Sequence, residues 1–326
     1  MEEHHEGVLT FAEVQEGIHP VSYEIIGKAR ELADQLEVEV YSVLLTGVDV
    51  SPEELVYRGA DKVFVFNHPA FSQPNEMIHE KNIVDFVKEL KPEIFLIGAT
   101  NFGRSLAPRV AAALETGLTA DCTNLRIKEG KLEQIRPAFS GNVLAHIMTS
   151  TVPQMATVRY KEFKEPTRDP SREGEIIEKE PTIPSDTGIE ILGVEQKEEV
   201  DLAEAEIIIS GGRGLKKPKD FKLLEKLATL LGGKVGSSRP LVDEGWISKA
   251  HQVGYSGNRV KPRLYIATGI SGAPQHLVGM RDSDCIVAIN KDRSAPIFRV
   301  ADYGVVGDLY KIVPELIKVL KRAGEE

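Results

Sequence analysis

Hydrophobic positions in the first 120 residues alternate between short continuous runs and stripes at helical spacing. The runs predict buried strands at 8–13, 38–45, 62–66 and 93–98. The stripes predict helices at 22–36, 75–90 and 105–115. Ser22 is the expected N-cap of the first helix, Lys91-Pro92 ends the second, and Pro108 lies in the first turn of the third. Strands separated by such helices predict right-handed crossovers onto a parallel sheet, the plan of a Rossmann-like α/β domain.

The pattern changes after this first stretch. From Ala120 to Tyr160 it becomes that of strands, most clearly at 143–148 and 155–160. Residues 161–200 then carry four prolines among many glutamates, which is typical of an exposed, solvated connection, with short edge strands such as 189–194 as the alternative. We therefore expect an N-terminal domain over 1–200, including this connection, and a second domain over 201–326.

The second domain also alternates strands and helices. Strands are predicted at 206–210, 234–236, 263–268, 285–290 and 296–300. Helices are predicted at 221–231, 274–280 and 307–320, and Gly232-Gly233 ends the first of them. The whole chain is therefore expected to be of the α/β class, with a second parallel sheet.

Length and charge narrow the class of protein. The 326 residues suit two domains, and 40 basic against 50 acidic residues give a formal charge of −10. This balance argues against nucleic acid as a partner, because phosphate backbones are bound by clustered positive charge. Two cysteines, Cys122 and Cys285, are too few for a disulfide scaffold or a four-cysteine metal site. With no apolar run near the ~20 residues of a membrane helix and no signal-peptide core, we expect a soluble, cytoplasmic protein without membrane insertion.

Two predicted strands of the second domain run directly into glycine-rich turns. Strand 206–210 leads into Ser-Gly-Gly-Arg-Gly at 210–214, and strand 263–268 leads into Gly-Ile-Ser-Gly-Ala-Pro at 269–274. Glycine lets a backbone approach a phosphate closely, and free amides at the start of the next helix point at the anion. Because ligands of open parallel sheets bind at the carboxyl ends of strands, the turns predict a nucleotide or dinucleotide site. The GxGxxG and Walker A motifs are absent.

Five side chains near these turns have both a binding and a structural interpretation. Arg213 fits a phosphate ligand or a surface loop, and Arg239 fits a phosphate, an aromatic ring or a helix cap. His276 fits the site or the protein interior. Asn290 fits an adenine or ribose edge or a turn, and Asp308 fits the site or a helix cap.

No side chains suited to hydrolysis or group transfer stand out. The sequence lacks a nucleophile elbow, a histidine motif for a metal, and a pair of acids placed for acid–base catalysis. We therefore predict no catalytic and no metal-ligating residue, and a bound cofactor would have to supply any reaction.

At these turns the sequence resembles the alpha subunits of electron-transfer flavoproteins. In the second domain the segments that carry the resemblance are Ser-Gly-Gly-Arg-Gly (210–214), Gly-Ser-Ser-Arg-Pro (236–240), Gln-Val-Gly-Tyr-Ser-Gly (252–257), Tyr-Ile-Ala-Thr-Gly-Ile-Ser-Gly-Ala-Pro-Gln-His-Leu (265–277), Ala-Ile-Asn-Lys-Asp (288–292) and Ala-Asp-Tyr-Gly (301–304). The first domain adds Leu-Ala-Pro-Arg-Val-Ala-Ala (106–112), Gly-Leu-Thr-Ala-Asp-Cys (117–122) and Arg-Pro-Ala-Phe (136–139). So many motifs in the same order make a chance match improbable.

The resemblance implies one FAD in a flavodoxin-like C-terminal domain, with roles assigned by position. The pyrophosphate would be bound by Arg213, Ser238 and Ser271, and the adenosine by Asn290, Asp308 and Leu309. The flavin and ribityl chain would lie against Val253, Gly254, Tyr255, Ser256, Ser271, Gly272, Ala273, Pro274, Gln275 and His276. Arg239 would lie on the isoalloxazine ring, Ser256 (threonine in some relatives) would approach N5, and His276 would face the pyrimidine carbonyl as a cation or hydrogen-bond donor.

The resemblance also implies partners. The N-terminal domain would dock a beta subunit, and the heterodimer would relay electrons one at a time from donor dehydrogenases to a quinone oxidoreductase or a ferredoxin-linked acceptor. Some anaerobic relatives bifurcate electrons, with NADH as donor and a second FAD in the beta subunit. Such a chain is a redox carrier without a substrate-transforming site of its own. Two rivals remain: a non-redox regulatory or scaffold subunit that binds an adenine nucleotide, and a flavin dehydrogenase that acts alone.

Overall fold

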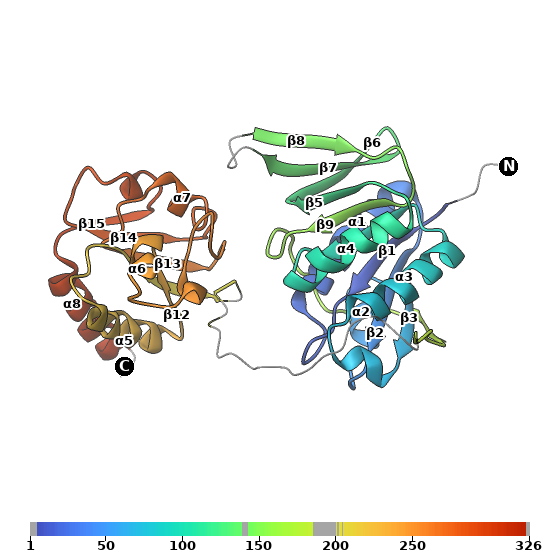
Figure 1. Ribbon diagram of the computed structural model, residues 1–326, viewed down its shortest axis with the longest axis horizontal. Helices are drawn as coiled ribbons and strands as arrows, with labels where there is room; N and C mark the ends of the chain where they lie inside the picture. Colours follow the sequence, from blue (N-terminus) through green and yellow to red (C-terminus); the bar gives the residue numbers. More distant parts are fainter. Residues whose placement is uncertain (1–4, 139–142, 185–199, 201, 204, 324–326) are drawn as a thin grey trace. The chain divides into compact units, whose positions relative to one another are not determined.

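The computed structural model describes residues 5–138, 143–184, 200, 202–203 and 205–323. It divides into two compact units, Met1–Leu192 and Gly193–Glu326, each with its own sheet and hydrophobic core (Figure 1). Within the described ranges, every helix is too short or too polar to cross a lipid bilayer.

The first unit is built on a parallel sheet in the order β10-β3-β2-β1-β4-β9-β5. Its strands are β1 (Val8–Ala12), β2 (Val40–Thr46), β3 (Lys62–Asn67), β4 (Ile94–Gly98), β5 (Leu118–Cys122), β9 (Gln154–Val158) and β10 (Glu175–Lys179). One face packs on α1 (Pro20–Leu36) and α2 (Glu53–Val56), and the other on α3 (Glu76–Leu90) and α4 (Asn101–Ala113). The short 3₁₀ helix η1 (Pro69–Ser72) follows β3.

A small antiparallel sheet in the same unit accounts for the strand-rich stretch after residue 120. It contains β6 (Asn124–Lys128), β7 (Lys131–Ala138) and β8 (Val143–Met148), in that order. Leu125 of β6 and Leu132 of β7 are fully buried in the core that also contains α1, so this sheet is anchored to the first unit.

Two helix starts in the first unit differ from the sequence-based expectation. Helix α1 begins at Pro20, whose fixed φ suits a first helical position, and the Nδ1 atom of His19 caps it by accepting from the Val21 amide at 3.1 Å. Ser22 is therefore not the N-cap; its hydroxyl accepts from the Glu13 amide at 3.0 Å. Helix α4 begins at Asn101 behind the cap Thr100, so Pro108 lies inside the helix rather than in its first turn.

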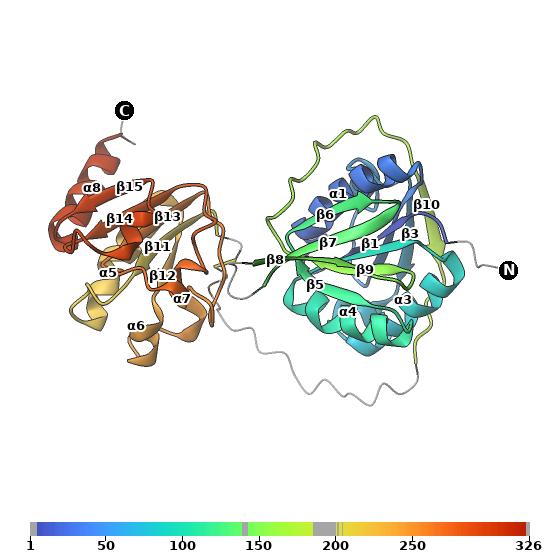
Figure 2. The same cartoon turned by 90° about the horizontal axis from the view of Figure 1, so that it is seen from above.

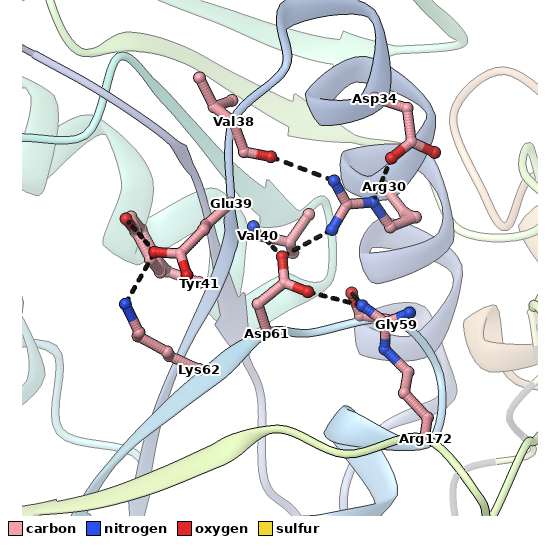
Figure 3. A network of polar contacts seen from close by, with 10 residues as sticks. All are labelled: Arg30, Asp34, Val38, Glu39, Val40, Tyr41, Gly59, Asp61, Lys62 and Arg172. Atoms are coloured by element: carbon pink, nitrogen blue, oxygen red, sulfur yellow. Dashed lines mark hydrogen bonds and ion pairs between the residues drawn. The ribbon is translucent and has the colours of Figure 1, made fainter.

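The segment 161–184, which we call the strap, is mostly exposed and contains an edge strand, as its composition predicts, but it is also bound along the first unit. The Lys161 amide donates to the Glu24 carboxylate at 2.9 Å, and β10 pairs in parallel with β3 at the sheet edge. Asp61 accepts from Arg30 of α1 and Arg172 of the strap, both at 2.6 Å (Figure 3). These side-chain contacts are long-range, so composition could not reveal them. The expected strand 189–194 lies outside the described residues.

The second unit has a parallel sheet in the flavodoxin-like order β12-β11-β13-β14-β15. Its strands are β11 (Ile207–Gly211), β12 (Lys234–Ser237), β13 (Leu264–Thr268), β14 (Ile286–Asn290) and β15 (Tyr303–Val306). Helices α5 (Phe221–Leu231) and α8 (Leu309–Ala323) pack against one face (Figure 2), and the short helix α6 (Arg239–Asp243) contributes to the same hydrophobic core. The other face is covered by α7 (Pro274–Leu277) and the 3₁₀ helix η5 (Pro296–Arg299).

The last strand of this sheet is not the one the sequence pattern predicts. Residues 296–300 form η5 rather than a strand, and the fifth strand is β15, which pairs in parallel with β14. Pro296 has no amide hydrogen for a strand ladder, and its fixed φ suits a helical start. All four residues of β15 are exposed, so the strand lacks the buried apolar run by which strands are recognised.

Candidate ligand-binding site

The predicted site residues of the second unit lie along the carboxyl edge of its sheet. Arg213 follows β11, Ser238 and Arg239 follow β12, Asn290 ends β14, and Asp308 follows β15. The loop Ser271–Ala273 follows β13. Five strands at a spacing of ~4.8 Å make this edge ~19 Å long, which suits an extended ligand better than a single phosphate. The chain reverses its strand order between β11 and β13, the usual ligand position in such sheets.

The two glycine-rich turns interlock at this point of strand-order reversal. The Gly212 amide donates to the Thr268 carbonyl at 3.0 Å, and the Gly214 amide donates to the Gly269 carbonyl at 2.9 Å. A Cβ atom on Gly214 would lie 2.5 Å from the Cα atom of Gly269, closer than any side chain tolerates. Because the turns bind each other, they form one shared wall, and the amides of Gly212 and Gly214 are already occupied within it.

A hollow opens beside this wall, toward β14 and β15. It is lined by Gly214, Gly269, Ile289, Asn290, Lys291, Gly307 and Leu309. The Asn290 side chain is held in a turn, because it donates to the Ile270 carbonyl at 2.8 Å and accepts from the Asp292 amide at 2.9 Å. Lys291 pairs with Asp308 at 3.0 Å, and Asp308 also caps α8 by accepting from the Tyr310 amide. That amide and then Lys291 lower the pKa of Asp308.

Tyr310 ties together two walls of the hollow and was not found from the sequence. Its hydroxyl donates to Asp220 and accepts from the Lys216 amide at 2.7 Å. The loop after β11 is thereby joined to the first turn of α8, and the Lys216 ammonium lies 5.1 Å from the centre of the Tyr310 ring. A tyrosine in an amphipathic helix carries no motif, so only the fold shows this contact.

At the opposite end of the edge, a loop and a short helix far apart in sequence meet. The loop Val253–Ser256 starts beside β12, since the Val253 amide donates to the Ser237 carbonyl at 2.9 Å. The Tyr255 amide donates to the Gln275 carbonyl at 2.7 Å, and Gly254 reaches this contact with a φ of 146° that favours glycine. Arg239 is the first residue of α6, which follows β12, and it is exposed. Its guanidinium pairs with Asp243 at 3.2 Å.

The remaining predicted residues of this end lie on the segment that continues from β13 into α7. Gly272 has a φ of 87° and its Cβ position would be 2.3 Å from the Ile297 amide, so no side chain fits there. Ala273 is the N-cap of α7, and Pro274 and Gln275 form the helix's exposed start. Ser238 is buried at the N-cap of α6, where its amide donates to the Gly211 carbonyl. Among the described residues, no partner holds the Arg213 side chain.

His276 is buried and uncharged. Its Nε2 atom lies 3.0 Å from the hydroxyl of the fully buried Tyr265, and its Nδ1 atom is buried without a hydrogen-bond partner of good geometry. Burial lowers the pKa of His276 to about 4, opposed by the nearby backbone of Val253. Burial thus favours the neutral ring in the ligand-free protein, which supports the hydrogen-bond donor among the two roles inferred above.

This buried histidine predicts an acid-sensitive second unit. The pKa of His276 falls from 6.5 to about 4 on folding, so between these pH values the unfolded chain binds more protons and stability decreases as pH decreases. The free energy of unfolding should fall by roughly 3 kcal/mol over this pH range. His276→Gln should flatten this dependence, measured as urea unfolding between pH 7 and 4 with the single tryptophan, Trp246, as the probe. An equal loss in wild type and variant would contradict the assignment.

No group of histidine, cysteine, aspartate or glutamate side chains able to hold a metal ion occurs within the described ranges. The polar groups along the edge are instead hydroxyls such as that of Ser271 and cations such as Arg213 and Lys291. This donor set suits a phosphate-bearing organic ligand.

Comparison with known proteins agrees with this chemistry. The family model described as electron transfer flavoprotein domain matches residues 8–184, and the model described as electron transfer flavoprotein FAD-binding domain matches residues 201–281. The chain is 47% identical to an electron transfer flavoprotein subunit alpha of Megasphaera elsdenii, over 98% of this chain and 97% of that protein. It is 49% identical to the subunit of the same name from Thermoanaerobacterium thermosaccharolyticum, over 97% and 98%. Subunit LctC of a lactate dehydrogenase (NAD(+),ferredoxin) from Acetobacterium woodii is 46% identical, over 97% and 77%.

Proposed function

The chain belongs to the family of electron transfer flavoprotein alpha subunits, and on this premise we propose that it holds one FAD along the carboxyl edge of the second sheet and relays electrons one at a time. The observation that carries the proposal is the arrangement of that edge. A hollow with a lysine at its rim lies at one end, interlocked glycine turns lie in the middle, and the end of β12, with the loop Val253–Ser256 and the exposed Arg239 that follow it, lies at the other. An adenosine, a diphosphate and a flavin ring occur in the same order in FAD.

The residues present suit FAD at each of these positions. The hollow lined by Asn290 and Leu309 would take the adenosine. Arg213, which pairs with no described residue, and Lys291 would offset the charge of the diphosphate. Ser238 and Ser271 would add hydroxyl donors. The loop Val253–Ser256 and the segment Ser271–His276 would line the ribityl chain and ring, while Asp308 holds Lys291 in place.

Bound FAD would supply the one-electron chemistry that none of the side chains here can supply. Arg239 would lie against the ring and favour negative charge on it, because its guanidinium stays protonated. Ser256 would donate a hydrogen bond to the ring. His276, whose Nε2 atom lies 3.0 Å from the Tyr265 hydroxyl, would contribute a hydrogen bond to the ring.

The partner proposals rest on the relatives. Their names describe alpha subunits, so we propose a beta subunit as the partner. The resemblance of the motifs further implies that the first unit docks this subunit, that dehydrogenases donate the electrons, and that a quinone oxidoreductase or ferredoxin-linked protein accepts them. The name of the Acetobacterium woodii relative contains NAD(+) and ferredoxin. This favours, as a second candidate function, an electron-bifurcating assembly in which NADH is the donor.

The test is a reductive titration of the chain co-expressed with its beta subunit, with extraction and counting of the nucleotides. One FAD per heterodimer reduced in one-electron steps supports the simple carrier, and two FADs with reduction by NADH support the bifurcating assembly. A colourless heterodimer that carries only an adenine nucleotide and fails to take up added FAD would favour a non-redox nucleotide-binding subunit. Turnover of an organic substrate by the isolated chain would favour a dehydrogenase that acts alone.

Arg213→Ala should weaken FAD binding without unfolding the protein. Charge-assisted hydrogen bonds to phosphate contribute about 1.5–3 kcal/mol, so the dissociation constant should rise about 10- to 100-fold. Flavin fluorescence quenching on titration of the FAD-free chain measures it. Arg263→Ala is the matched control, because Arg263 is 80% exposed and precedes β13, at the opposite edge of the sheet. Equal effects of the two substitutions would contradict the role of Arg213.

A further inference from the structure

Gln252 is a buried polar side chain to which neither the sequence nor the proposed function assigns a role. It is 4% exposed and follows the 3₁₀ helix η4 (Lys249–His251). Its backbone forms a parallel bridge with Ser237 at the end of β12, and its carbonyl accepts from the Asn258 amide at 2.7 Å. Gln252 is therefore fixed to the sheet on one side and closes the loop 252–258 on the other.

The side chain of Gln252 reaches one member of the proposed flavin-binding loop. Its Nε2 atom donates to the Ser256 hydroxyl oxygen at 3.1 Å. Ser256 itself is exposed, and no described residue accepts a hydrogen bond from its hydroxyl. A serine hydroxyl has one donor and two acceptor sites, so the Gln252 amide occupies an acceptor site and leaves the O–H free for another partner.

Without this contact, backbone carbonyls near Ser256 would compete with a ligand for the hydrogen of its hydroxyl. Serine side chains in loops readily donate to nearby backbone carbonyls, which would turn the O–H away from a ligand. A donor that points at Ser256 from a fixed position removes this freedom, because the hydroxyl cannot direct its hydrogen toward an N–H group. The hydroxyl hydrogen is thereby kept away from the Gln252 side and is available on the open side before the ligand binds.

We infer that Gln252 is a positioning residue that orients the Ser256 hydroxyl as a hydrogen-bond donor to an acceptor atom of the flavin ring. The inference rests on the proposed function, since it requires FAD against this loop. A fixed donor at a ring atom stabilises the state with more negative charge and raises the potential of the first electron step. Gln252 acts only through Ser256, so its contribution depends on the presence of that hydroxyl.

A double-mutant cycle in the FAD-loaded heterodimer tests the inference. The variants are Ser256→Ala, Gln252→Met, which keeps the volume without a donor, and the double substitution. We expect Ser256→Ala to lower the equilibrium constant of the first reduction step about tenfold, which corresponds to 59 mV for one electron. Gln252→Met should reproduce most of this change, and the double variant should show no more than Ser256→Ala alone.

Gln252→Glu separates orientation from packing. The carboxylate has nearly the same shape but accepts hydrogen bonds, so it should draw the Ser256 O–H toward itself and lower the potential at least as much as Gln252→Met. If either Gln252 variant only lowers the melting temperature and keeps the wild-type potential, Gln252 is a structural residue and the inference is overturned. Additive effects in the double variant would overturn it too. Failure of the wild-type heterodimer to bind FAD would instead refute the proposed function, so the two failures are distinguishable.

Discussion

Replacing Gly214 with valine is expected to weaken FAD binding by the second unit roughly 100-fold. The Cβ atom alone would lie 2.5 Å from the Cα atom of Gly269 and 3.2 Å from both its carbonyl oxygen and Leu309. Two backbones cannot yield as a flexible side chain can, so the turns must separate at a cost of about 3 kcal/mol or more. Gly214, Gly269 and Leu309 all line the hollow assigned to the adenosine, and the separation would distort it.

Flavin fluorescence titration measures this loss, and the emission of Trp246 reports whether the second unit remains folded. Gly214→Ala should have the same effect in a smaller amount, because it adds the clashing atom without the two methyl groups. Gly17→Val is the control, since nothing lies within 4 Å of its Cβ position in the first unit. FAD affinity within threefold of wild type in a folded Gly214→Val protein would show that the interlocked turns do not shape the site.

Asp61→Ala is expected to lower the free energy of unfolding of the first unit by about 3 kcal/mol. The substitution removes the acceptor of three donors at once, the guanidinium groups of Arg30 and Arg172 and the amide of Val40 (Figure 3). The Val40 amide and one N–H group of each arginine would lose their acceptor, although Arg30 keeps Asp34 and Arg172 keeps the Gly59 carbonyl, and leaving partly buried donors without an acceptor costs more than the interaction gains. The Asp61 side chain is 27% exposed, so we place the cost near the lower end of that for buried pairs.

Denaturant unfolding followed by circular dichroism measures this change, and hydrogen exchange at β10 shows whether the strap is released. Asp34→Ala is the matched control, because Asp34 also pairs with Arg30 but is 66% exposed, and such pairs contribute about 0.2–1 kcal/mol. We expect exchange in β10 to rise in Asp61→Ala and to stay unchanged in Asp34→Ala. Similar stability of the two variants would mean that the strap does not depend on Asp61.

Elements with strong local patterns could be predicted from the sequence almost to the residue. Helix α5 and strand β8 have the predicted bounds, because each combines an uninterrupted pattern with clear flanking signals. The failures occur where a nearby group outside the pattern decides the local structure. His19 rather than Ser22 caps α1, and Pro296 starts a 3₁₀ helix where an apolar run resembles a strand.

For the site, the sequence determined the residue types and only the structure determined their partners. The glycine turns and the family motifs could be read along the chain, because each is a short local signal. Gln252 and Tyr265 each begin one of these motifs and Tyr310 belongs to none, but no motif reveals their contacts, because each contacts a group four to ninety-four residues away.

The sequence by itself therefore determined the α/β class, the family, and the residue types along the candidate site of the second domain. The tertiary structure alone decided that the two glycine turns bind each other, that the strap 161–184 lies along the first unit, and that His276 is buried beside Tyr265. The physical reason is that propensity and motif act over a few neighbouring residues. Close backbone approach, paired charges and the burial that sets a pKa depend instead on which distant segments the sheet order places side by side.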